Sequence, residues 1–67
     1  MYTEDISKYL EDIKEAVRDS KKHHEIRLAA AVEYSLPFAI TYNTEQITER
    51  VKRLEMLDYL TKLVSNQ

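Results

Sequence analysis

The two histidines of the chain, His23 and His24, are the side chains best suited to chemistry, because imidazole can bind a metal ion or transfer a proton near neutral pH. Asp19 and His23 are four residues apart, so a helix would project both from one face as a pair of metal ligands. A structural zinc site needs four ligands, whereas the chain has no cysteine and no third ligand close in sequence. We therefore expect no metal site.

The hydroxyl groups of the chain offer no nucleophile that is paired with a base. Because the sequence contains no glycine, it has neither the glycine-framed turn that presents a catalytic serine nor a glycine-rich loop that cradles phosphates. The carboxylates are scattered along the chain and do not converge. We expect a non-catalytic protein that uses no cofactor.

An apolar stripe at helical spacing runs through the first half of the chain. Residues that recur every three or four positions lie on one face of a helix. The stripe keeps its phase through the polar stretch 18–23 and consists of Ile6, Leu10, Ile13, Val17, His24, Leu28 and Ala31. This pattern predicts one helix over about residues 4–34. The alternative is a break near Ser20, which could cap a separate helix that begins at Lys21.

His24 lies on this apolar stripe, so we expect its ring to be buried and hydrogen-bonded. If the ring is buried between chains, its protonation at acidic pH would weaken the assembly.

The segment 35–43 is predicted to connect two helices, since the residue before Pro37 is disfavoured in a helix. Phe38, Ile40 and Tyr42 alternate with other residues as in a strand. One interpretation is that Phe38 and Ile40, with Leu36, close the end of a helical bundle. The other is that Phe38, Ile40 and Tyr42 form an exposed segment that binds a partner.

The second helix is predicted over about residues 44–64. Asn43 is a favourable N-cap, and Gln46 three residues later completes a capping box. The apolar residues of this helix change face along its length, which is typical of a helix that contacts two neighbours.

The 67 residues are expected to form a single small helical domain that is all-α, with a long helix and a shorter antiparallel helix in a hairpin. So small a chain without disulfides needs another stabiliser, and we expect a homodimer that forms a coiled-coil-like four-helix bundle. The predicted dimer interface comprises Ile6, Leu10, Ile13, Val17, Leu57, Leu60, Leu63 and Val64.

The charge balance does not by itself predict a nucleic-acid or membrane partner, with 10 basic against 12 acidic residues and a net charge of −2. No apolar run approaches the roughly 20 residues that span a bilayer, and the first residues lack the pattern of a signal peptide. We expect a cytoplasmic protein. The segment 18–27 is locally basic and is either a solvated face or a contact for a partner, through Arg18, Lys21, Lys22 and Arg27.

Residues 44–60, with the pattern T-x-x-x-I-x-x-R-V-x-x-L, resemble the recognition-helix region of winged-helix repressors over about a quarter of the chain. The resemblance implies that Gln46, Arg50 and Arg53 face the major groove of DNA. The sequence has no glycine for the turn after that helix and no residues for a wing.

The function expected from the sequence is that of a small interaction or regulatory protein that binds another protein through a helical face. Chains of this size and composition are common among bacterial and phage accessory proteins. A small DNA-binding regulator and a structural assembly unit are the alternatives.

Overall fold

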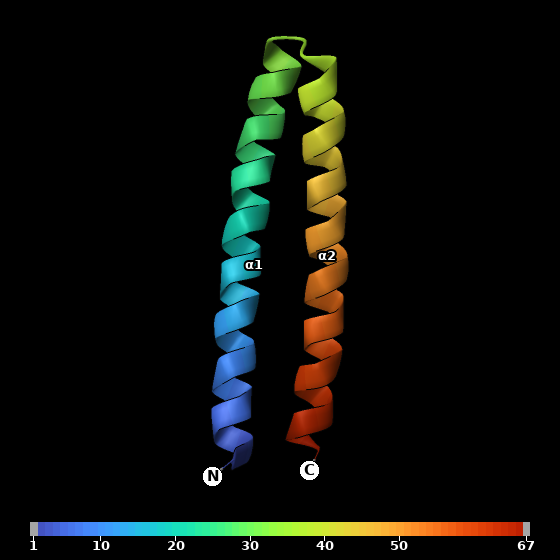
Figure 1. Cartoon of the computed structure of the whole chain (residues 1–67). Coiled ribbons are helices and arrows are strands. Elements are labelled where there is room, and N and C mark those ends of the chain that lie inside the picture. Colours follow the sequence, from blue (N-terminus) through green and yellow to red (C-terminus); the bar gives the residue numbers. More distant parts are fainter. Residues whose placement is uncertain (1, 67) are drawn as a thin grey trace.

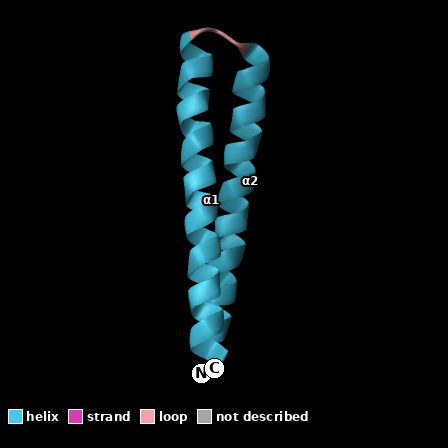
Figure 2. Cartoon of the chain, turned by 60° about the vertical axis from the view of Figure 1, so that its left-hand side comes forward, coloured by secondary structure: helices cyan, strands magenta, loops and turns pink. Residues whose placement is uncertain are grey.

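Two long helices form an antiparallel hairpin (Figure 1) in the computed structural model, which describes the backbone of residues 2–66 and the side chains of residues 5–66. Helix α1 spans Tyr2–Glu33 and helix α2 spans Pro37–Ser65. Both termini lie at one end and the turn lies at the other, as a second view also shows (Figure 2). The part of the chain that is described contains no strand, which confirms the all-α prediction. The hairpin measures 50 × 14 × 11 Å.

Helix α1 is continuous, so the long helix is confirmed and the alternative break near Ser20 is wrong. Ser20 is half-buried in the middle of α1 and caps nothing. Over the described residues, neither helix contains an apolar stretch long enough to cross a membrane.

The tight turn between the helices satisfies the last carbonyls of α1. The backbone N–H of Leu36 donates to the carbonyl of Ala31 (2.9 Å), and the N–H of Ser35 donates to that of Val32 (3.2 Å). This pair of bonds is the Schellman motif, whose central residue takes a left-handed conformation. Ser35 occupies that position with φ 53°, where glycine is usual. The chain therefore makes a glycine-type turn without glycine.

The predicted connection 35–43 and the predicted start of the second helix at residue 44 are both wrong. Helix α2 begins at Pro37, because proline fits the first position of a helix, where its missing N–H has no partner to lose. Leu36 is extended (φ −103°, ψ 92°), as expected before proline, so one proline ends α1 and begins α2. Asn43 is therefore inside α2, and the two helices are nearly equal in length.

The helices meet along a seam in which buried or half-buried residues recur at alternating steps of three and four, the heptad spacing of coiled coils. The seam consists of Leu10, Lys14, Val17, Lys21, His24, Leu28 and Ala31 on α1 and Ile40, Asn43, Ile47, Arg50, Leu54, Leu57, Thr61 and Val64 on α2.

The hydrophobic core within this seam is small. Leu10, Val17 and Leu57 are buried together, and partly buried aliphatic side chains pack against them. No side chain that the structure describes is wholly removed from solvent. Leu10 near the start of α1 is buried as well, so α2 covers α1 as far as this residue.

Candidate interaction surface

Polar side chains interrupt the seam at several levels, although a seam between two helices is usually apolar. They are Lys14, Lys21, His24, Asn43, Arg50 and Thr61. The hydrogen bonds and ion pairs of Lys14, His24 and Arg50 show which residues of α1 and α2 face each other. They also show which residues lie on either side of the seam.

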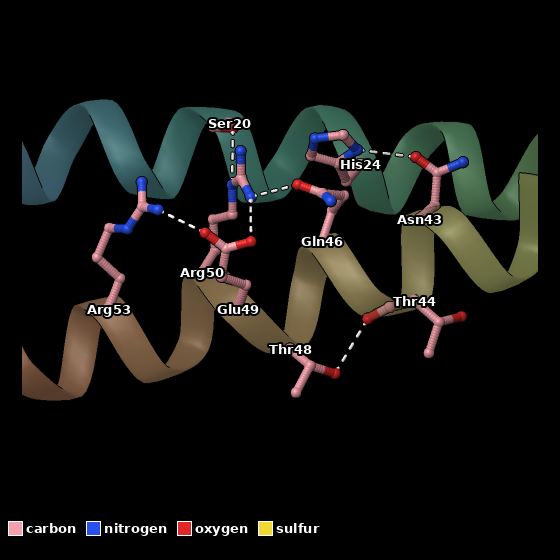
Figure 3. A network of polar contacts seen from close by, with 9 residues as sticks. All are labelled: Ser20, His24, Asn43, Thr44, Gln46, Thr48, Glu49, Arg50 and Arg53. Atoms are coloured by element: carbon pink, nitrogen blue, oxygen red, sulfur yellow. Dashed lines mark hydrogen bonds and ion pairs between the residues drawn. The ribbon is translucent and has the colours of Figure 1, made fainter.

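His24 and Asn43 form a buried hydrogen bond across the seam near the turn (Figure 3), with Nδ1 of His24 2.8 Å from Oδ1 of Asn43. The Asn43 Nδ2 group donates to the carbonyl of Ala39 at 2.8 Å, which directs Oδ1 toward the histidine. Nδ1 of His24 is then the donor in this contact. The ring also meets Tyr42 edge-on, at a centroid distance of 5.9 Å. The expectation of a buried, hydrogen-bonded histidine is confirmed.

Lys14 crosses the seam near the termini. Its Nζ lies 2.7 Å from Glu11 of α1 and 3.3 Å from Asp58 of α2. The hydrogen bond to Glu11 raises the pKa of Lys14 above its ordinary 10.5, the contact with Asp58 adds to this effect, and burial opposes it. The aliphatic stem of the lysine fills the seam while its charge reaches two exposed carboxylates.

Arg50 makes the corresponding contact at mid-length (Figure 3). Its Nε donates to Ser20 Oγ of α1 at 3.2 Å, and its Nη1 donates to the side-chain oxygen of Gln46. Glu49 lies 3.4 Å from the same guanidinium and also pairs with Arg53. The three residues that the winged-helix resemblance assigns to DNA are thus engaged within the hairpin.

These contacts distinguish two sides of the hairpin. In heptad notation abcdefg with the seam at a and d, Glu11 and Asp58 are e positions, whereas Ser20 and Gln46 are g positions. The e and g positions flank a seam on opposite sides. Each helix therefore contributes its e and b positions to one side and its g and c positions to the other.

The e and b side, called the charged side, carries Lys8, Glu11, Glu15, Arg18, Lys22 and Glu25 on α1 and Glu55, Asp58 and Lys62 on α2. Its large apolar residues are Val32 and Val51.

The g and c side, called the apolar side, has few charges. Near the termini it presents Ile6, Tyr9, Ile13, Met56, Leu60 and Leu63, all of which are exposed except the half-buried Ile13. Its charged residues lie at mid-length and are Arg27, Glu49 and Arg53. Exposed apolar residues grouped on one side of two helices are typical of an interaction site.

The predicted dimer interface divides into two groups. Leu10, Val17 and Leu57 form the core of the hairpin itself, and Ile13 and Val64 pack against that core. Ile6, Leu60 and Leu63 remain exposed on the apolar side. Tyr9 and Met56 are exposed on the same side. Dimerisation through the exposed group stays a prediction.

The tip of the hairpin is a second exposed apolar region. Phe38 is 92% exposed, and Tyr34 and Leu36 beside it are also exposed. Within the single hairpin, Phe38 does not close the end of the bundle, which was one of the two interpretations. Because α2 begins at Pro37, Phe38 lies in its first turn and points outward. Of the other candidate partner-binding residues here, Tyr42 is exposed but leans on His24, and Ile40 is half-buried.

The basic residues of segment 18–27 do not gather into one patch. Arg18 and Lys22 lie on the charged side and Arg27 lies on the apolar side. Lys21 is half-buried in the seam and pairs with Glu25 at 3.5 Å. The four charges are thus divided among the charged side, the apolar side and the seam.

Within the described residues there is no pocket and no group of three side chains that could hold a metal ion. Asp19 and His23 are both exposed, and no further ligand joins them. The hairpin thus offers surfaces and not a cavity.

Sequence reasoning missed Lys14, Asn43 and Arg50 as seam residues. The steps of four and three that connect Leu10, Lys14, Val17 and Lys21 were a usable signal. An apolar pattern does not include these residues, because they keep the heptad spacing but are polar.

Comparison of the chain with protein-family models, with curated proteins and with solved structures finds no match.

Proposed function

We propose that this chain is a non-catalytic interaction protein that binds another protein at the tip of the hairpin. The observation that supports this most directly is the exposure of Phe38, at 92%, beside the exposed Tyr34 and Leu36. These three apolar side chains lie close together in sequence at the turn and are not part of the small core. Because their contact with water is unfavourable, a partner that covers them gains their burial.

We further propose that two copies assemble into a four-helix bundle. The hairpin exposes 5372 Å², whereas a compact protein of 7.9 kDa exposes about 4,400 Å². The excess of about 1,000 Å² is close to the ~800 Å² that each partner buries in a standard interface. A pair of helices with so polar a seam gains much of its missing burial from a second copy.

The alternative of a DNA-binding regulator receives less support. Reading a base edge requires guanidinium groups free to reach the groove. Arg50 is held by Ser20 and Gln46, and Arg53 is paired with Glu49. The third possibility is a structural assembly unit. Such a protein would bind only further copies of this chain and no other protein.

Site-specific photo-crosslinking in the cells that produce the protein tests the proposal. A photoreactive residue in place of Phe38 should yield a discrete adduct with a different protein, and one in place of the exposed Glu55 on the charged side should not. The adduct should disappear when Leu36 is changed to Ser. Adducts with the chain itself alone would favour the assembly unit, and adducts with nucleic acid would favour the DNA-binding alternative.

A further inference from the structure

We infer that the apolar side of the hairpin is covered by a second copy of this chain, with the tips of both hairpins at the same end of the bundle. This inference rests on the proposed four-helix bundle and specifies its contact face and its alignment. Both follow from where polar and apolar residues lie along the apolar side.

The contrast between the two sides selects the face. On the charged side, charged residues occur from Lys8 to Glu25 of α1 and over the terminal half of α2. Burying them against a second copy would require partners for each one. On the apolar side, the terminal half presents aliphatic and aromatic side chains from both helices, so this is the side whose burial is favourable.

The apolar side also varies along the 50 Å length of the hairpin. Near the termini, Ile6, Tyr9 and Ile13 of α1 lie level with Met56, Leu60 and Leu63 of α2, as the Lys14–Asp58 contact requires. The Arg50–Ser20 bond places a polar zone at mid-length. Toward the tip, the side presents the small Ala30 and Ala39 together with the exposed aromatic rings of Tyr34 and Tyr42. The side is therefore aliphatic and aromatic near the termini, polar at mid-length, and lined by alanine and tyrosine toward the tip.

Two symmetric alignments can bring a pair of such sides together. With the tips at opposite ends and the hairpins fully overlapped, Ile13 of one copy falls level with about His23 of the other copy's α1, so the apolar terminal residues face the polar zone. With the tips at the same end, each level meets the same level of the second copy, and α1 of one chain lies on α2 of the other. The apolar terminal halves then cover each other, and the polar zones meet at mid-length.

Same-end alignment has a consequence for the proposed function. The exposed residues of each tip, Tyr34, Leu36 and Phe38, come together at one end of the bundle. A partner would then meet one composite surface formed by two chains, and one dimer would bind one partner at that end.

A matched pair of variants on α2 tests the face. Leu60 (38% exposed) lies on the apolar side, and Val51 (37% exposed) lies on the charged side. L60E should weaken dimerisation by about 100-fold or more, because it buries an unpaired charge in each copy. V51E should change the dissociation constant by less than about threefold. Sedimentation equilibrium over a range of concentrations measures both, and circular dichroism reports the helix content.

A second experiment measures the alignment of the two copies. It uses chains that keep Leu60, so its result does not depend on whether L60E folds. The chain has no cysteine, so E33C near the tip and S65C near the termini can each carry a single spin label. Helices in a bundle pack about 8–10 Å apart. Same-end alignment should give distances below about 30 Å for both labels, and opposite alignment should give distances near the 50 Å length of the hairpin for both.

The outcomes separate the two levels of the proposal. A wild-type chain that stays monomeric at millimolar concentration would contradict the four-helix bundle, and the inference with it. A dimer that resists L60E but is disrupted by V51E would overturn the face and leave the bundle intact. Long distances from both labels would overturn the alignment alone.

Discussion

Nδ1 of His24 and Oδ1 of Asn43 lie 2.8 Å apart in the seam, on opposite helices and 19 positions apart in sequence. Neither residue can shift along its helix without leaving a buried polar group unpaired, which is unfavourable by about 1–3 kcal/mol. The pair therefore fixes the register of α1 against α2 near the turn, as a buried asparagine does in coiled coils.

Asn43→Ala should lower the free energy of unfolding by about 1–3 kcal/mol, because the His24 donor loses its buried acceptor. His24→Leu should have a cost of similar size. The double variant H24L/N43A should be less unstable than the sum of the single effects, since no buried group is then left unpaired. Urea unfolding at one fixed protein concentration measures the three values. Strict additivity would show that the two side chains do not interact.

Ser35→Gly should stabilise the hairpin by about 1 kcal/mol, because φ 53° is costly for a residue with a Cβ atom and free for glycine. Ser35→Ala is the matched control, since it removes the hydroxyl and keeps the Cβ, and it should leave stability nearly unchanged. Thermal and urea unfolding report both variants. A destabilising Ser35→Gly would mean that the left-handed turn is not under strain.

Arg50→Ala should reduce stability by about 1–2 kcal/mol, because it removes the guanidinium that joins α2 to Ser20 of α1. Arg53→Ala, which removes only an exposed pair with Glu49, should cost less than about 0.5 kcal/mol. The two variants are compared by their urea midpoints. If instead both were stable and both lost binding to random duplex DNA at low salt, the arginines would serve DNA recognition.

Lys14 should make stability depend on alkaline pH. Its pKa is raised in the folded chain above the ordinary 10.5, so the folded state holds this proton more tightly than the unfolded state. The stabilising contribution is complete below pH 10.5 and is lost as the pH rises through the raised value. The stability difference between wild type and Lys14→Met should shrink above pH 10.5. Lys22→Met, at an exposed position of the charged side, should show no such trend.

The all-α class and the continuity of α1 were predictable from the sequence, because the apolar stripe keeps one helical phase from Ile6 to Ala31. The start of α2 was not predictable in the same way. Two local signals competed, proline at a first helical position and asparagine as an N-cap. The apolar stripe of α1 continues to Ala31, and a helix that begins at Pro37 brings Ile40 and Asn43 into the seam opposite this end of α1.

The sequence by itself determined which residues prefer helix and where α1 must end, since backbone preferences and hydrophobic period are local properties. Only the tertiary structure decided which polar residues enter the seam. Lys14, Asn43 and Arg50 are tolerated there because the opposite helix supplies Asp58, His24 and Ser20 at the right level. Which residues of α1 and α2 face each other depends on the geometry of the turn, and the sequence alone does not determine that geometry. The resulting packing of the two helices leaves the apolar side and Phe38 exposed.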